Sequence, residues 1–577
     1  MAHTTKAYIR AVSREARLVL ASRRMNVQQI AASLGLADDE LELYGRDKAK
    51  LSLTVLERRR TKPDGKLVLI TAISPTPAGE GKTVTTIGLG DGLAGIGKRA
   101  VVCIREPSLG PTFGVKGGGA GGGRAQAHPA IDLNLHFTGD FHAIGAAHNL
   151  MAALAEAHYY HGNSAGFAPH GLTWNRVVDV TDRALREVVV ALGGKANGSP
   201  RETGFEITAA SELMALVSLS ADYRDLRARL GRVVLGHTSD RKPITADQLG
   251  IAGAAAILLK DALRPNLIRT QEGTPMLAHT GPFGNIATGH NSILEDWIAL
   301  KLGEVVTTEA GFGSDLGFEK FCHLVAPALG RGPDAAVVVA TVRGLKAHSG
   351  KWALKPGKPL PKDLEQEDLE ALKKGAANLR AHIENVKQFG VPVVVAVNRF
   401  PTDTTRELQQ IAELALASGA DGAEISEGFA RGAEGTRALA ETVWRVLAEK
   451  PARFTPLFAA DAPIRQKLET LGQRVYRAGK VELSKVAAQK LAELEDWGFG
   501  RLPVCVAKTQ YSFSHDPELI GAASGYTLPI VDLQLAAGAG FVKAMCGDIL
   551  TMPGFGAKPA ALGMDLDAEG KPVGLSG

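Results

Sequence analysis

The sequence predicts an α/β protein with a mostly parallel sheet, helices on both faces of that sheet, and two smaller α/β domains. Three observations carry this prediction. Short apolar segments rich in β-branched residues, such as Leu67–Ser74 and Val391–Val397, are typical of strands buried on both faces. An amphipathic helical pattern at 369–386 directly precedes the second of them. The length of 577 residues is too great for a single hydrophobic core.

The strand expected at Leu67–Ser74 runs into a glycine-rich loop and then into a helix-like run that reaches Gly97. The loop resembles the phosphate-binding pattern GxxxxGK[ST], with Thr76 in place of its first Gly. Its glycines let backbone N–H groups converge, Lys82 adds a positive charge for the β- and γ-phosphates, and Thr83 offers a hydroxyl to Mg²⁺. We therefore predict a P-loop NTPase-like sheet. The predicted ATP-binding residues are Thr76, Pro77, Ala78, Gly79, Glu80, Gly81, Lys82 and Thr83.

The position of this loop and the changes in composition along the chain suggest three domains. Residues 1–145 and 240–360 are expected to form a discontinuous nucleotide-binding domain, with 146–239 as an inserted α/β subdomain. The segment 350–368 carries three prolines and mixed charge, so we place a boundary there and assign 361–577 to a C-terminal α/β domain.

The next predicted strand, Ala100–Ile104, ends in Arg105 and Glu106. Open α/β sheets bind ligands beyond the carboxyl ends of their strands, so both side chains are expected in the same crevice as the phosphate loop. The run 117–123 holds six glycines in seven residues, and its position suggests close backbone approach to a ligand rather than a linker. A nucleotide cradle beside an Arg and a Glu suggests phosphoryl transfer onto a small acid, or simple ATP hydrolysis.

Composition excludes several classes of protein. Lys and Arg number 66 and Asp and Glu 61, a net charge of +5, which is too small to indicate a nucleic acid or an anionic membrane as partner. No apolar run reaches the length of a membrane span, and no secretory signal is apparent at the N-terminus. The four cysteines are far apart and form no CxxC pair, which fits a reduced, cytoplasmic setting.

The remaining elements are predicted less directly. Residues 1–60 look helical and charged, with a capping box at Asn26 and Gln29, and are expected to pack outside the main sheet. Lys48 and Lys50 are interpreted as part of a solvated face. Further helices are expected near 181–192, 209–219 and 480–496.

Three features leave alternatives open. The polar segment 262–291 is interpreted as an ordered functional loop rather than a spacer. Phe400 and Phe429 follow strand-like pieces and form either a stacking clamp or part of a core. A cluster of histidines is either a metal site or a set of hydrogen-bonded residues, and we favour the second because no acidic or Cys partner stands at ligand spacing. These histidines are His136, His142, His148 and His158.

The longest motifs occur in the order found in the formate–tetrahydrofolate ligase family, which the sequence resembles from about Glu40 to its C-terminus. They read TPAGEGKT, REPSLGP, LNLHFTGDFHAI, TEAGFG, ATVR, AKTQYSFS and AGAGF. The resemblance implies that ATP joins formate to tetrahydrofolate through formyl phosphate, giving 10-formyltetrahydrofolate, ADP and phosphate. It also implies a homotetramer of three-domain subunits activated by a monovalent cation, potassium or ammonium.

By the same resemblance, Lys82, Arg105 and Glu106 are catalytic, and they hold formyl phosphate together with Thr208. The implied folate contacts are Asp140, Phe400, Ile425 and Phe429, with Phe400 as one wall of an aromatic clamp. Phe429 stands where the family usually has Trp. Further departures from the family pattern, which bear on folate affinity, rate and the cation site, occur at Arg124, Ala130, Thr181, Thr288, His290 and Gln534.

Two competing functions are weaker. A protein that uses ATP as a switch or scaffold, without formyl transfer, would not need the Arg105–Glu106 pair or an aromatic clamp. A Rossmann dehydrogenase is disfavoured because no GxGxxG opens the sheet, whereas Lys82 supplies a phosphate-binding charge.

Overall fold

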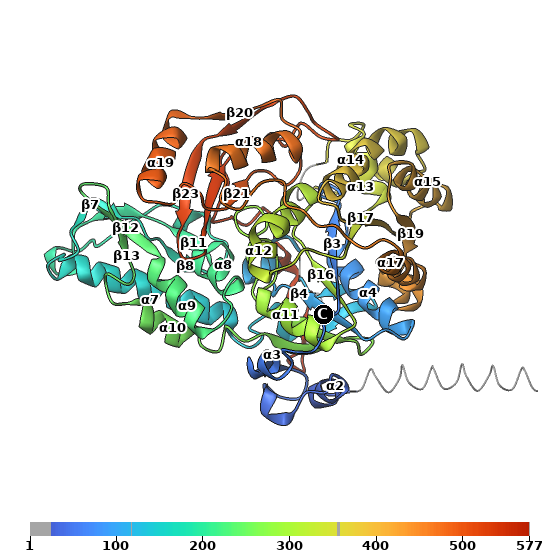
Figure 1. The fold of residues 1–577 in the computed structure, drawn as a ribbon, viewed down its shortest axis with the longest axis horizontal. Coiled ribbons are helices and arrows are strands. Elements are labelled where there is room, and N and C mark those ends of the chain that lie inside the picture. Colours follow the sequence, from blue (N-terminus) through green and yellow to red (C-terminus); the bar gives the residue numbers. More distant parts are fainter. Residues whose placement is uncertain (1–24, 117, 355–357, 576–577) are drawn as a thin grey trace, which may run out of the picture.

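The computed structural model describes residues 25–116, 118–354 and 358–575, and a mixed sheet of twelve strands forms the centre of this part of the chain (Figure 1). Ten strands follow one another across the sheet, in the spatial order β1 (Leu41–Leu43), β2 (Ala49–Leu51), β14 (Asn266–Thr270), β15 (Pro275–Ala278), β4 (Ala100–Ile104), β16 (Val305–Glu309), β3 (Lys66–Ala72), β17 (Ala335–Ala340), β18 (Val393–Asn398) and β19 (Gly422–Ser426). The last two, β5 (Gly121–Gly122) and β6 (Ala125–His128), branch from β14.

The seven strands from β15 to β19 in this order are parallel, so their carboxyl ends meet at one edge of the sheet. The antiparallel strands β14, β2 and β1 extend the sheet on the β15 side. The expected mostly parallel sheet with helices on both sides is confirmed.

Successive residues of β3 point to opposite faces, as the two-residue period of a strand requires. Leu67 and Leu69 enter one core, and Val68 and Ile70 enter another. The first core is covered by α11 (Ile293–Leu302), α13 (Val342–His348), α14 (Leu369–Lys387) and α15 (Thr405–Ala417). The second lies under α4 (Lys82–Gly95) and α17 (Arg437–Glu449).

Two groups of smaller sheets lie beside the main one (Figure 1). The strands of the first group are β7 (Phe167–Leu172), β8 (Arg176–Val178), β9 (Val188–Val190), β10 (Arg201–Thr203), β11 (Phe205–Ile207), β12 (Val234–Thr238) and β13 (Pro243–Thr245). Its helices are α7 (Asp140–Tyr160), α8 (Glu212–Ser218), α9 (Tyr223–Arg232) and α10 (Ala252–Leu259).

The second group, drawn in orange and red, packs around its own apolar core. It contains β20 (Lys480–Leu483), β21 (Val504–Ala507), β22 (Thr527–Ile530), β23 (Asp532–Ala536), β24 (Phe541–Met545), α18 (Ile464–Arg474) and α19 (Lys485–Asp496). The proposed three-domain division stays a prediction, although β18 and β19 continue the main sheet beyond residue 361.

Several local predictions were wrong. The segment 181–192 holds a 3₁₀ turn at Arg183–Leu185 and the strand β9, because three consecutive valines favour a strand. Residues 1–60 do not all lie outside the sheet, since β1 and β2 join its edge. The polar segment 262–291 contains two strands, β14 and β15, whose polar side chains are buried among hydrogen-bonding partners.

Other predictions were confirmed. The Asn26–Gln29 capping box is present at the start of α2 (Val27–Ser33), and the helix expected at 209–219 is α8. Within the described residues, no helix combines the length and apolar character needed to cross a bilayer.

Candidate active site

The predicted phosphate loop, Thr76–Thr83, follows β3 and runs into the first turn of α4, and its own side chains close it. The buried carboxylate of Glu80 accepts hydrogen bonds from the backbone N–H (2.7 Å) and the hydroxyl (3.1 Å) of Thr76. Gly79 and Gly81 have φ angles of 75° and 76°, which favour glycine. A Cβ at Gly81 would also collide with the amide of Asn398, which donates to the Glu80 carbonyl at 3.1 Å. The end of β18 therefore holds this loop in shape.

Glu309 connects the phosphate loop to Arg105. It ends β16, the strand between β3 and β4, and is almost fully buried. Its Oε2 accepts the hydroxyl of Thr83 at 2.9 Å, and its Oε1 lies 3.5 Å from Nη2 of Arg105. Thr83 in the first turn of α4, Glu309 at the end of β16 and Arg105 just after β4 thus surround one point.

The loop between β15 and α11 fixes this arrangement from one side. The Pro282 carbonyl accepts Nη1 of Arg105 at 3.2 Å, and Nδ1 of His290 donates to the Glu309 carbonyl at 3.0 Å. The other ring nitrogen of His290 lies 2.6 Å from Asp296 on α11. Nε of Arg105 is buried and has no hydrogen-bond partner, so the guanidinium retains a donor for a ligand.

Glu106 and Asp140 form a buried carboxyl pair beside this point. The amide of Asn266 donates to Glu106 at 3.0 Å and to Asp140 at 2.8 Å, and Nζ of Lys50 lies 2.7 Å from Asp140. Burial, followed by the charge of Asp140, raises the pKa of Glu106 well above its usual value. Burial alone would raise the pKa of Asp140. The interactions with Lys50 and His279 outweigh this effect of burial and hold the Asp140 pKa below its usual value. Of the two carboxyls, Glu106 is therefore the one that favours its protonated form, and Asp140 the one that favours its charged form.

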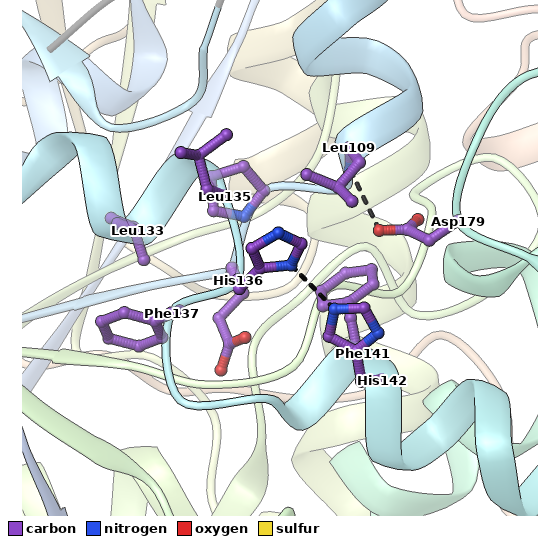
Figure 2. Close-up of a pocket in the computed structure, with 10 residues that line it drawn as sticks. Leu109, Leu133, Leu135, His136, Phe137, Phe141, His142 and Asp179 are labelled. Carbon is purple, nitrogen blue, oxygen red and sulfur yellow. Dashed lines mark hydrogen bonds between the residues drawn. The ribbon is translucent and has the colours of Figure 1, made fainter. Parts of the chain in front are cut away.

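A pocket opens next to Glu106 (Figure 2). Leucine and phenylalanine side chains make up much of its wall, and His136 and His142 add polar atoms, with 2.8 Å between Nδ1 of the first and Nε2 of the second. Asp179 closes another side, where it accepts the Ser108 hydroxyl at 2.7 Å and the Leu109 N–H at 3.1 Å. Burial raises the pKa of Asp179 to about 6. The full lining is Glu106, Pro107, Leu109, Leu133, Leu135, His136, Phe137, Phe141, His142 and Asp179.

The histidines of this region bind one another or other protein groups. His148 contacts the hydroxyl of Ser211 at 2.8 Å and the Asn175 carbonyl at 3.0 Å. His158 accepts the Ala165 N–H at 3.0 Å.

The aromatic residues Phe400 and Phe429 follow the ends of β18 and β19, and Ile425 lies within β19. Phe429 is 54% exposed, so it is not a core residue, and its ring lies over Gly122. Within the described chain, the rings of Phe400 and Phe429 do not contact each other. Instead, Cζ of Arg343 lies 3.4 Å from the ring centroid of Phe400.

Thr208 and two of the positions that depart from the family pattern lie among the loops around the site. Thr208 is buried opposite Gly145 of α7, and it does not hydrogen-bond to Arg105 or Glu106. The hydroxyls of Thr181 and Thr288 are buried without a partner. Gln534 is exposed on β23.

Four residues of this site were missed or misread in the sequence. Lys50, interpreted as solvated, is fully buried because its charge meets that of Asp140. Asn266 lay in a segment interpreted as a loop. Glu309 and Arg343 belong to the motifs TEAGFG and ATVR, but no short-range pattern in the sequence marks their partners.

Comparisons with known proteins agree with the motif order. The model of the family described as formate–tetrahydrofolate ligase matches residues 14–576. The formate–tetrahydrofolate ligase of Roseiflexus sp. (strain RS-1) is 52% identical over 556 residues, 96% of this chain and 98% of that protein. The one from Cereibacter sphaeroides (strain ATCC 17029 / ATH 2.4.9) is 52% identical over 565 residues, 98% of this chain and 100% of its own length. The one from Paracoccus denitrificans (strain Pd 1222) is 51% identical over 554 residues, 96% of this chain and 98% of its own length.

Proposed function

Because the chain belongs to the formate–tetrahydrofolate ligase family, we propose that the carboxyl edge of its main sheet ligates formate through formyl phosphate. The protein joins formate to tetrahydrofolate at the expense of ATP. The observation that carries the proposed site is the contact of Glu309 with both Thr83 and Arg105, which links the phosphate loop to a guanidinium.

ATP binds along the loop Thr76–Thr83 in a P-loop NTPase-like manner. Backbone N–H groups and the start of α4 face the phosphates, and Lys82 supplies the charge. The residues present fit a magnesium ion held together with ATP, because Thr83 and Glu309 place a hydroxyl and a carboxylate side by side. The ion, when bound, neutralises charge on the β- and γ-phosphate oxygens.

Formate is activated first, since a carboxylate is a poor acyl donor. One formate oxygen attacks the γ-phosphorus, the bond to the β-phosphate oxygen breaks, and ADP leaves. Negative charge spreads over the transferring oxygens, where Lys82 and Arg105 stabilise it. The unpartnered Nε of Arg105 supports this role, because a bound formyl phosphate would supply the missing acceptor.

Folate then accepts the formyl group. Its N10 attacks the formyl carbon, the carbon–oxygen bond to phosphate breaks, and N10 loses its proton as phosphate leaves. We place the folate near Asp140, Ile425 and the rings of Phe400 and Phe429. The Glu106–Asp140 pair supports this placement, because a carboxyl that favours its proton, beside a carboxylate paired with Lys50, suits a heterocycle that both donates and accepts hydrogen bonds. Thr208 helps to shape the same pocket.

Further properties rest on the family resemblance. We expect activation by potassium or ammonium, without assigning the cation to particular residues. We also expect a homotetramer, and the exposure of apolar side chains such as Ile257 on α10 is consistent with subunit contacts. All four cysteines are buried free thiols, which supports a cytoplasmic location.

Oxygen transfer tests the formyl phosphate step. Formate labelled with ¹⁸O is incubated with ATP, tetrahydrofolate and the protein, and the phosphate released is analysed by mass spectrometry. The proposal predicts one ¹⁸O atom per phosphate, because the attacking oxygen stays on phosphorus when the formyl carbon is transferred. Unlabelled phosphate formed alongside 10-formyltetrahydrofolate would contradict the intermediate. Unlabelled phosphate without that product would instead favour a protein that uses ATP as a switch.

A further inference from the structure

Arg343 lies between the two proposed substrate sites. It lies in the first turn of α13, shortly after the end of β17, on the same edge of the sheet as the phosphate loop. Its guanidinium carbon lies 3.4 Å from the ring centroid of Phe400, and its Nη2 lies 3.5 Å from the carbonyl of Gly79 in the phosphate loop. One side chain thus touches both the loop proposed for ATP and the ring proposed for folate.

The guanidinium of Arg343 lacks a strong acceptor. Among the described residues it forms no ion pair, and its only hydrogen bond is the long one to Gly79. Its Nε is buried without a partner. The carboxylates of Glu80 and Asp403 act on it only at longer range. Both are otherwise engaged, since Glu80 accepts from Thr76 and Asp403 accepts the Phe400 N–H at 2.7 Å. A partly buried cation in this position favours an anion that arrives with a ligand.

The phosphate groups of ATP are the anion that this position suits. Among the residues that the structure describes, the only backbone acceptor that Arg343 reaches belongs to the loop that would surround those phosphates. A guanidinium can donate in its plane while its face lies against an aromatic ring, so binding a phosphate need not end the contact with Phe400. A lysine could donate to the phosphate, but its ammonium group has no planar face to lie against the Phe400 ring.

We propose that Arg343 couples nucleotide binding to folate binding, by donating to a phosphate oxygen of ATP while its face holds the Phe400 ring in place for folate to stack on the other side. This inference rests on the proposed function of both sites. Each ligand then raises the affinity for the other by the same factor, as linkage requires. Arg343 is a positioning residue toward folate, because it acts on that ligand through Phe400.

The test measures the coupling itself. The dissociation constant of tetrahydrofolate is measured by calorimetry on the full chain, with and without saturating ADP and Mg²⁺. We expect ADP to tighten folate binding about tenfold in the wild-type protein, within the usual range of coupling between sites. The coupling is read as the ratio of the tetrahydrofolate dissociation constant without ADP to the one with ADP. In Arg343→Met, which keeps an unbranched apolar chain, this ratio should fall close to one.

Two further variants serve as controls for the coupling measurement. Arg399→Met is the matched control, because Arg399 directly precedes Phe400, is exposed, and pairs with Glu427 at 2.9 Å. It should leave the ratio unchanged. Arg343→Lys keeps the charge without the planar face, so it should bind ADP nearly as well as wild type while losing more than half of the coupling free energy.

The outcomes separate this inference from the function on which it rests. A wild-type ratio of one, or the same ratio in wild type and in folded Arg343→Met, would overturn the coupling role. If Arg343→Met does not fold by circular dichroism, an unchanged ratio in Arg343→Lys would overturn it instead. A wild-type protein that binds neither ADP nor tetrahydrofolate would contradict the proposed function first.

Discussion

The hydroxyl of Thr83 donates a 2.9 Å hydrogen bond to the carboxylate of Glu309, which joins the end of the phosphate loop to the end of the neighbouring strand β16. The second oxygen of the same carboxylate lies 3.5 Å from Arg105. A carboxylate that is buried between a hydroxyl and a guanidinium is held in one orientation, so the geometry exists before any substrate binds.

Glu309→Gln should weaken the use of magnesium. The substitution keeps the size of the side chain and an oxygen acceptor for Thr83, but removes the charge that we assign to the metal. We expect the Mg²⁺ concentration for half-maximal turnover to rise about 10- to 100-fold. Titration of Mn²⁺ into the ADP complex, followed by electron paramagnetic resonance, gives the same comparison without turnover.

Glu304→Gln is a suitable control for Glu309→Gln, because Glu304 precedes β16 and pairs with Arg99 at the surface. It should leave the magnesium dependence unchanged. If Glu309→Gln has a wild-type magnesium dependence by both measurements, its carboxylate does not hold the ion.

Lys50→Met should destabilise the protein strongly. The variant leaves Asp140 buried without its cation, a change that typically costs about 3–5 kcal/mol. Lys48→Met is the matched control, since Lys48 pairs at 2.7 Å with Asp132, whose side chain is 47% exposed. Its cost should stay below about 1 kcal/mol. Equal shifts in the thermal unfolding midpoints of the two variants would refute the importance of the buried pair.

Phe429→Ala should raise the KM for tetrahydrofolate and leave the KM for ATP nearly unchanged. Stacking of an aromatic ring on the folate contributes about 1 kcal/mol beyond burial, which corresponds to a factor of about five. Phe429→Trp should lower the same KM, because the ring is 54% exposed and a larger one has space toward solvent. A weakened ATP site with an unchanged folate KM in the Ala variant would place Phe429 outside the folate site.

Asp179 should make the stability fall as pH rises. Burial raises its pKa to about 6 in the folded chain from 3.8, so the fold disfavours the charged form. This contribution is therefore favourable below about pH 4 and is lost as pH rises through about 6. Relative to Asp179→Asn, which does not titrate, wild type should lose on the order of 2 kcal/mol between pH 4.5 and 7. Parallel pH dependences of their thermal midpoints would count against an effect of Asp179.

Local patterns sufficed for much of the fold. Apolar runs located β3, β4 and β18 within a residue or two, and the Asn26–Gln29 capping box marked the start of α2. They failed where burial depends on a distant partner. Lys50 becomes a buried residue only because Asp140, 90 positions away, supplies its counter-charge.

In the candidate site, too, local patterns predicted some residues, and contacts between distant residues were missed. The phosphate loop, Arg105 and Glu106 were predictable because each follows an apolar strand, and parallel strands bring such ends to one edge. Contacts across the sheet were not predictable. The Thr83–Glu309 bond joins residues 226 positions apart, and α14 and β18 lie between Arg343 and Phe400 along the chain.

We propose that ATP is cleaved at the phosphate loop only together with formyl transfer to folate. The most direct measurement follows ADP and 10-formyltetrahydrofolate together, with formate and tetrahydrofolate supplied singly and jointly. It compares wild type with Lys82→Ala and with the control Lys66→Ala, whose lysine lies half-exposed at the start of β3. We expect equal amounts of the two products when both substrates are present, and a loss of about 10²–10³ in rate for folded Lys82→Ala only. Equal ADP release whichever substrate is omitted, or near-normal turnover in Lys82→Ala, would contradict it.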